Sequence, residues 1–235
     1  MENLTEFATG PLFRLSIAIM LLGLARALYL AIAGGLEAKR KAADKELPKS
    51  FVTRLTFGYM LPLRALRMKP FYSIISIIFH AGLIVTPIFL YDHVHLIYSS
   101  IGIAWLGLTL PKQAADILTL VTILAGIMLL VLRASGKESR FLSRPQDYWL
   151  LILLIIPFVS GYVCSNFIIT PGAYDAFFLI HVLSGNLIFI LLPFTKLVHS
   201  VLLPLSQWIT ARSWKFDPQG PENAAVVISR EGDKS

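Results

Sequence analysis

Long apolar stretches alternate with short polar segments along the whole chain. A helix needs about 20 apolar residues to cross the hydrocarbon core of a membrane, and five stretches reach or approach that length. The pattern predicts an all-α bundle of five transmembrane helices within residues 1–205, followed by an extended cytoplasmic tail at residues 206–235. The predicted helices cover residues 12–33, 71–97, 114–132, 148–167 and 176–203.

The composition agrees with a multi-pass membrane protein in contact with lipid. The 235 residues are 56% hydrophobic and 15% charged, which is too apolar for a soluble domain of this size. The net charge of +7 has no stripe of basic residues interleaved with aromatic residues, so nucleic acid is not an expected partner.

The basic residues predict how the helices are oriented. Residues 37–70 contain nine Lys or Arg against three acids, and residues 133–144 add four more basic side chains, whereas the loops on the opposite side contain only Lys112. Because cytoplasmic loops of membrane proteins are enriched in Lys and Arg, we expect the N-terminus outside and the C-terminus in the cytoplasm. Glu2 and Glu6 occupy the place of a basic leader region, so we expect no cleavable signal peptide.

All five histidines fall within the second and fifth apolar stretches: His80, His93, His95, His181 and His199. Ionisable side chains are costly inside a membrane and are usually functional there, and imidazole is a common axial ligand of heme iron. The chain has no C-x-x-C-H motif and a single cysteine, Cys164, which we interpret as a packing residue. Any heme is therefore expected to be held without covalent attachment.

The histidine spacing predicts two bis-histidine sites at opposite depths. His181 and His199 are 18 residues apart, which is five helical turns and about 27 Å along one helix face. With antiparallel helices, His80 lies at the depth of His199 on the cytoplasmic side, and His181 lies opposite an outer histidine of the second helix. The alternative is that each histidine is only a hydrogen-bonded packing residue.

Two histidines compete for the outer position opposite His181. Relative to His80, an ideal helix rotates about 220° to His93 but only about 60° to His95, which favours His95. Pro87 lies between them and can change the phase of the helix. Only one of the two needs to be a ligand.

Other polar side chains accompany these positions. Asp92, His95, Lys112 and Asp116 share the outer depth, where quinone chemistry needs proton donors and acceptors; alternatively, Lys112 and Asp116 only cap and anchor the third helix. Arg26 and Lys196 are candidates for pairing with heme propionates, or they extend to the lipid headgroups. Gly82 and Gly185 allow close approach, either of a porphyrin or of a neighbouring helix.

Several motifs resemble one family of membrane cytochromes. The fifth stretch resembles the last helix of the respiratory nitrate reductase gamma subunit family, which includes the membrane cytochromes b of heterodisulfide reductase and of sulfite-reduction-associated complexes. That stretch reads Leu179-Ile-His181-Val-Leu-Ser-Gly185-Asn-Leu-Ile-Phe189-Ile-Leu-Leu-Pro193-Phe194-Thr-Lys196-Leu-Val-His199. Further agreement comes from Ile78-Phe79-His80, Pro87-Ile-Phe89-Leu90-Tyr-Asp-His93 and Leu142-Ser-Arg144-Pro-Gln-Asp147-Tyr148.

The resemblance implies five helices with two b hemes. It assigns His80 and His199 to the cytoplasmic-side heme, and His93 rather than His95 to the outer heme with His181. The two histidines of the second stretch are farther apart than in nitrate reductase, and no Gly-His pair marks the second of them. The sequence is therefore nearer to the heterodisulfide and sulfite-associated branch.

The expected function is that of an electron-transfer subunit in the cytoplasmic membrane of a prokaryote. It connects a quinone pool, menaquinone or another quinone, with a cytoplasmic iron-sulfur or catalytic subunit. A periplasmic cytochrome c and further membrane subunits are additional expected partners. The competing interpretation is a heme-free membrane anchor for other subunits. A secondary transporter is disfavoured, because the five stretches contain no inverted repeat.

Overall fold

The chain folds almost entirely into helices. The computed structural model describes residues 2–41, 49–60, 63–102, 108–213, 222–223 and 226. Within these residues the one β-type pairing is an isolated bridge between Leu90 and Leu110, and short irregular segments join the helices. The chain divides into two compact units, and each is described by itself. Unit 1 comprises Met1–Ile19 and Lys69–Leu191, and unit 2 comprises Met20–Met68 and Leu192–Ser235.

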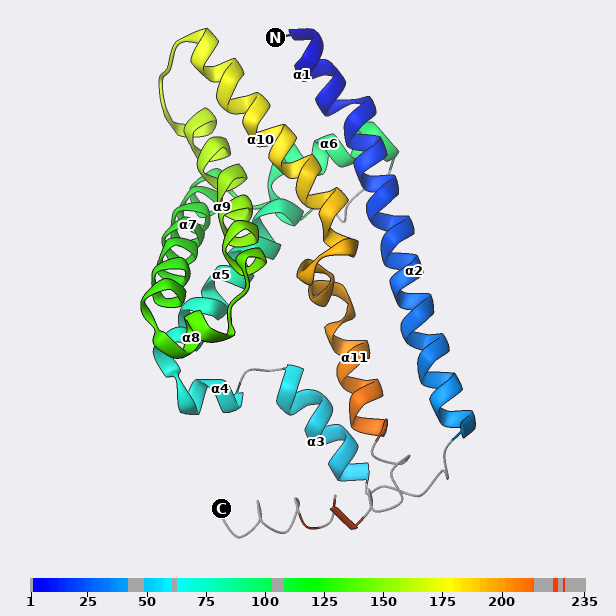
Figure 1. Cartoon of the computed structure of the whole chain (residues 1–235). Coiled ribbons are helices and arrows are strands. Elements are labelled where there is room, and N and C mark those ends of the chain that lie inside the picture. The colour runs from blue at the N-terminus through cyan, green and yellow to red at the C-terminus, as the bar shows by residue number, and fades with distance from the viewer. Residues whose placement is uncertain are drawn as a thin grey trace. The chain divides into compact units, whose positions relative to one another are not determined.

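Figure 1 traces the helices in chain order. Those of unit 1 are α1 (Glu2–Thr9), α5 (Pro70–Phe89), α6 (Tyr91–Ile101), α7 (Lys112–Ser135), α8 (Lys137–Leu142), α9 (Pro145–Asn166) and α10 (Pro171–Leu191). Helix α2 (Pro11–Lys41) begins in unit 1 and continues into unit 2. Unit 2 also contains α3 (Lys49–Met60), α4 (Leu63–Met68), two 3-10 turns (Leu192–Phe194 and Lys196–Val198) and α11 (His199–Ser213).

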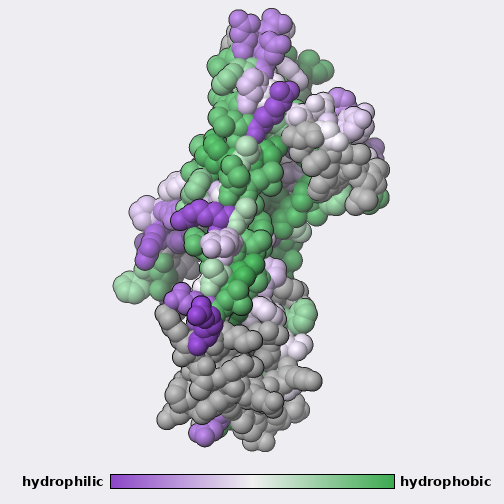
Figure 2. Space-filling view, turned by 90° about the vertical axis from the view of Figure 1, so that its right-hand side faces the viewer, coloured by the Kyte–Doolittle hydropathy of each residue, from purple (hydrophilic) through white to green (hydrophobic). Residues whose placement is uncertain are grey.

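Five helical segments are long and apolar enough to cross a membrane, which confirms the predicted number. They are Glu2–Ala38, Pro70–Phe89, Lys112–Ser135, Pro145–Asn166 and Pro171–Phe194. Large apolar side chains on them face outward: Leu22 is 73% exposed, Ile117 64% and Leu124 66%. Figure 2 shows large areas of hydrophobic side chains on one face of the molecule. Such a surface needs hydrocarbon around it, so the chain is a multi-pass membrane protein.

Small residues bring the helices of unit 1 together. Helix α5 packs on α7, α7 packs on α9, and α9 packs on α10. At the α5–α7 contact, a Cβ atom added to Gly82 would lie 1.7 Å from Thr122 Oγ1. Gly82 therefore serves helix packing, which is the second of the two roles considered for it.

The second predicted helix is interrupted, so the single helix expected over residues 71–97 is wrong in this respect. Helix α5 ends at Phe89, Leu90 is extended (φ −67°, ψ 130°), and α6 begins at Tyr91. The break lies three residues after Pro87, where the Phe89 carbonyl accepts a hydrogen bond from Leu110 N–H at 2.8 Å. Pairing with a segment distant in the sequence thus stabilises an extended residue between two helices.

The fifth predicted helix is also interrupted. Helix α10 ends at Leu191, and two 3-10 turns precede α11. Pro193 lies in the first of these turns and has no N–H to continue an α-helix. The expectation of one helix over residues 176–203 is therefore wrong, and the 18-residue spacing no longer places His181 and His199 on one helix face.

The predicted tail is partly helical. Residues 206–213 belong to α11, so the expectation that the extended tail begins at residue 206 is also wrong. Pro204 lies within this helix and lacks the N–H that would otherwise donate to the Ser200 carbonyl. Beyond residue 213, the tail outside residues 222–223 and 226 lies outside the described part of the chain.

The motif before the fourth span is the start of α9. Pro145 occupies the first helical turn, and the Arg144 N–H donates to the Asp147 carboxylate at 2.9 Å. This bond satisfies one donor at the helix start and places a negative charge there, which favours the N-terminal end of a helix. Asp147 also lies 3.9 Å from the Arg133 guanidinium at the end of α7.

Candidate functional site

Two of the predicted ligands meet within unit 1. The imidazole rings of His93 on α6 and His181 on α10 have centroids 5.8 Å apart and planes inclined by only 19°. Both side chains are partly buried. The two residues are 88 positions apart in the sequence (181 − 93) and reach each other from separate helices.

The nitrogen atoms of this pair are in defined states. His181 Nδ1 lies 2.7 Å from the Pro157 carbonyl of α9, and His93 Nδ1 lies 3.2 Å from the Pro87 carbonyl of α5. A carbonyl oxygen only accepts hydrogen bonds, so Nδ1 carries the proton and donates in both residues. In a neutral imidazole this leaves Nε2 with a free lone pair, as metal ligation requires.

His93 lies outside the membrane-crossing segments, and its surroundings keep it neutral. Burial lowers the pKa of His93 to about 4, and the neighbouring His181 contributes to the lowering. The hydrogen bond to the Pro87 carbonyl and the charge of Asp92 act in the opposite direction. Near neutral pH, His93 is therefore an uncharged imidazole that keeps its Nδ1 proton and has no proton to lose from Nε2 before binding a metal.

A glycine makes room for the His181 ring. A Cβ atom added to Gly161 of α9 would lie 2.9 Å from both Cε1 and Nδ1 of His181. Sequence reasoning missed Gly161 and the Pro157 carbonyl. The sequence does show a proline and a glycine four residues apart in an apolar stretch. This spacing predicts a contact with His181 only once α9 is known to pack against α10.

In the other predicted pair, His80 and His199, Nδ1 also donates a hydrogen bond to a backbone carbonyl. The Nδ1 atom of His80 donates to the Ser76 carbonyl at 2.7 Å, and the Nδ1 atom of His199 donates to the Lys196 carbonyl. Both side chains are exposed. His80 belongs to unit 1 and His199 to unit 2, so their pairing stays a prediction.

His95 differs from these four histidines. Its side chain is exposed, and its ring stacks on Tyr91 with centroids 6.4 Å apart. Its imidazole forms no hydrogen bond with the residues that the structure describes. Because Leu90 interrupts the helix, the ideal-helix rotation that favoured His95 does not apply, and it is His93 that lies beside His181.

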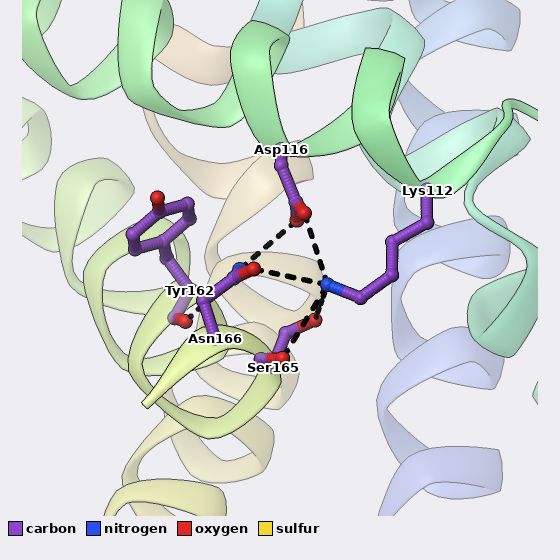
Figure 3. A network of polar contacts seen from close by, with 5 residues as sticks. All are labelled: Lys112, Asp116, Tyr162, Ser165 and Asn166. Atoms are coloured by element: carbon purple, nitrogen blue, oxygen red, sulfur yellow. Dashed lines mark hydrogen bonds and ion pairs between the residues drawn. The ribbon is translucent and has the colours of Figure 1, made fainter. Parts of the chain in front are cut away.

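The outer-depth candidates Lys112 and Asp116 belong to a polar network between α7 and α9 (Figure 3). Lys112 Nζ donates to Asp116 Oδ2 and Asn166 Oδ1, both at 2.9 Å, and to Ser165 Oγ at 3.3 Å. Asn166 Nδ2 returns a bond to Asp116 Oδ1 at 3.0 Å. The network ties the N-terminal end of α7 to the C-terminal end of α9, which agrees with the anchoring role.

The remaining candidates are distributed over both units. Asp92 is exposed in the first turn of α6, beside His93 in the chain. Arg26 on α2 and Lys196 in the second 3-10 turn are exposed side chains of unit 2. A Cβ atom at Gly185 of α10 would meet nothing within 4 Å, so close approach remains possible there. Cys164 is a free, partly buried thiol.

The spacing of the paired imidazoles is compatible with two ligands of one metal ion. Metal–imidazole bonds are about 2 Å long, so two rings on opposite sides of one metal ion have centroids about 6 Å apart. The observed 5.8 Å agrees with that value. The described residues contain no group of three or more His, Cys, Asp or Glu side chains suited to a metal ion, and a heme needs only two protein ligands.

Comparison with known proteins adds one relative. A protein of Nitratidesulfovibrio vulgaris (strain Hildenborough), which carries only the name "Protein", is 33% identical to this chain over 141 residues. The match covers 60% of this chain and 60% of that protein. No protein-family model and no solved structure matches the chain.

Proposed function

We propose that the chain is a diheme b subunit of a respiratory complex in the cytoplasmic membrane of a prokaryote. In this proposal it transfers electrons between a quinone pool, menaquinone or another quinone, and a cytoplasmic iron-sulfur or catalytic subunit. The observation that carries the proposal is the His93–His181 pair, whose ring centroids lie 5.8 Å apart with both Nδ1 atoms committed to carbonyls.

The residues have distinct roles in this proposal. His93 and His181 hold the outer heme, and His80 and His199 hold the cytoplasmic-side heme. Each heme supplies an iron that changes its charge by one electron. The Nδ1–carbonyl bonds keep each imidazole in the tautomer that presents Nε2, and Arg26 and Lys196 offer positive charge to the propionates.

Charge supports the proposed orientation and partners. Lys137, Arg140 and Arg144 are exposed on the segment between α7 and α9. An excess of basic residues on that side is typical of the cytoplasmic face, which supports an orientation with the N-terminus outside and the C-terminus inside. A cytoplasmic iron-sulfur subunit of the heterodisulfide reductase kind then meets this face.

In this proposal the quinone ring binds near the outer surface of the membrane. His95 is exposed on α6 and is not used by the histidine pair, so its imidazole is available for proton exchange. Lys112 and Asp116 are the further candidates, and Lys112 remains 62% exposed while it bonds to the network.

A reduced-minus-oxidised visible spectrum and a pyridine hemochrome assay of the purified chain test the proposal. Two b hemes per polypeptide are the expected result. A content of one heme per polypeptide would mean that only one of the two proposed ligand pairs binds heme. A folded chain that takes up no heme during expression with abundant heme would overturn the cytochrome proposal in favour of a membrane anchor.

A further inference from the structure

The imidazole of His181 packs against one turn of α9, from Pro157 to Gly161. The Pro157 carbonyl lies 2.7 Å from His181 Nδ1, and the missing side chain of Gly161 leaves room for the ring. Residues four apart in a helix lie on the same face, one turn from each other. The turn therefore supplies both a hydrogen-bond acceptor and the space for the side chain that uses it.

We infer that the Pro157–Gly161 turn is a positioning site that fixes the tautomer and the ring orientation of His181 for heme ligation. This inference rests on the proposed function and deepens it, because it names residues of a third helix that act on the outer heme through His181. Neither residue is itself a ligand.

Among side-chain donors, the His181 imidazole is the closest to the Pro157 carbonyl. The neighbouring Ser160 hydroxyl donates to the Ile156 carbonyl at 2.8 Å and reaches the Pro157 carbonyl only at 3.4 Å. The His181 bond is also shorter than the equivalent bond of His93, at 2.7 Å against 3.2 Å. The shorter of the two hydrogen bonds is therefore the one between His181 and α9.

The bond has an electronic consequence for the ligand. Donation from Nδ1–H to a carbonyl makes Nε2 a more basic metal ligand. A more basic axial ligand favours the oxidised iron and lowers the reduction potential of the heme. Displacing the ring from the Pro157 carbonyl should therefore raise the potential of the outer heme or weaken its binding.

Gly161→Ala is the direct test, because its Cβ atom would lie 2.9 Å from two atoms of the His181 ring. Gly34→Ala is the matched control: Gly34 lies in the apolar helix α2, and a Cβ atom there meets nothing within 4 Å. In the full-length protein, Gly34→Ala should match wild type. Gly161→Ala should hold fewer than two hemes, or hold two with a raised midpoint potential and a changed low-spin electron paramagnetic resonance signal.

A second measurement needs no heme. In heme-free wild-type protein labelled with ¹⁵N-histidine and ¹³C-proline, solid-state NMR should show His181 protonated at Nδ1 and coupled to the Pro157 carbonyl carbon. This measurement keeps the inference testable if Gly161→Ala does not fold. It also distinguishes failure of the proposed function from failure of this inference. A chain that binds no heme would refute the proposed function, whereas the contact between His181 and Pro157 could still be observed.

Two results would overturn the inference. One is a folded Gly161→Ala variant whose heme content, potentials and resonance signal equal those of Gly34→Ala. The other is wild-type His181 protonated at Nε2 or without coupling to Pro157.

Discussion

A histidine offers a nitrogen to a metal ion only when its other nitrogen holds the proton. His80, His93, His181 and His199 meet this condition through donation from Nδ1 to a backbone carbonyl. His95 forms no such bond among the described residues and stacks on Tyr91 instead. At the scale of single residues, this difference separates the four proposed ligands from the fifth histidine.

Replacing the outer histidines one at a time should separate their roles. His93→Ala removes a proposed axial ligand, so heme per polypeptide should fall from two toward one in the pyridine hemochrome assay. His95→Ala should retain two hemes, because His95 lies outside the His93–His181 ring pair. The reverse result, with loss on replacing His95 alone, would contradict the assignment.

Lys112 distinguishes a quinone site from an anchor. Lys112→Met removes an ion pair to Asp116 within α7 and the side-chain bonds from Lys112 to Ser165 and Asn166 of α9, but Lys112 is 62% exposed. The loss of stability should therefore be about 1 kcal/mol or less. If Lys112 serves quinone chemistry, the rate of heme reduction by a quinol analogue should fall at least several-fold, measured by stopped-flow absorbance.

Lys137→Met is the matched control for this variant. Lys137 is an exposed lysine in the first turn of α8, at the other end of α7. Equal reduction rates in the two variants would leave Lys112 with the anchoring role only.

The choice of His93 over His95 could not be made from helical geometry alone. The rotation of an ideal helix favours His95, and it fails because Leu90 is extended and restarts the helical phase. Pro87 indicates that the helix breaks nearby. The position of the break depends on the hydrogen bond between Phe89 and Leu110, which are distant from each other in the sequence. The resemblance stated from the sequence predicts His93, and the structure brings His93 beside His181; the role of His93 as a ligand stays a prediction.

At the scale of helices, the apolar runs were sufficient to predict the spans. Length and hydropathy identify a membrane helix because every backbone group inside the bilayer must be bonded internally. The ends were less predictable: residues 192–198 form 3-10 turns around Pro193, and residues 206–213 continue as helix. Helix contacts such as Gly82 on Thr122 depend on which helices are neighbours, and composition does not state this.

The contact between α5 and α7 should be sensitive to a single methyl group. Gly82→Ala places a Cβ atom 1.7 Å from Thr122 Oγ1 and 2.9 Å from Thr122 Cβ. Overpacking of this kind costs about 1–3 kcal/mol. We expect a lowered thermal midpoint, followed by the tryptophan fluorescence of the protein in lipid nanodiscs.

Two further variants make this result specific. Thr122→Ala in the Gly82→Ala background removes the closest atom and should recover part of the loss, whereas Gly34→Ala should leave the midpoint unchanged. If Gly82→Ala matches wild type, the close approach of α5 and α7 at this point is wrong.

At the scale of the whole molecule, the orientation in the membrane decides which face meets each partner. Basic side chains on α8 and on the residues around it predict that this segment is cytoplasmic. The connection between α9 and α10 then faces outward. The structure contains five helices long and apolar enough to span a membrane, and their direction across it is predicted from charge alone.

Cysteine labelling tests this orientation directly. After Cys164→Ser removes the single native thiol, a cysteine replaces either Lys137 on α8 or Gly172 at the start of α10. A membrane-impermeant maleimide added to spheroplasts should label the Gly172→Cys variant at once and the Lys137→Cys variant only after lysis. The opposite pattern would invert the protein and move the proposed cytoplasmic partner to the other face.

The extended residue at Leu90 also bears on how such proteins diverge. Because α5 and α6 are separate helices, an insertion or deletion at their junction changes the direction of one without turning the other. In an unbroken helix, each added residue would rotate everything beyond it by about 100°. A change in the number of residues between His80 and His93 would therefore leave each histidine at its own position on a separate helix. Searches that require a fixed spacing between these histidines will overlook relatives that keep the same architecture.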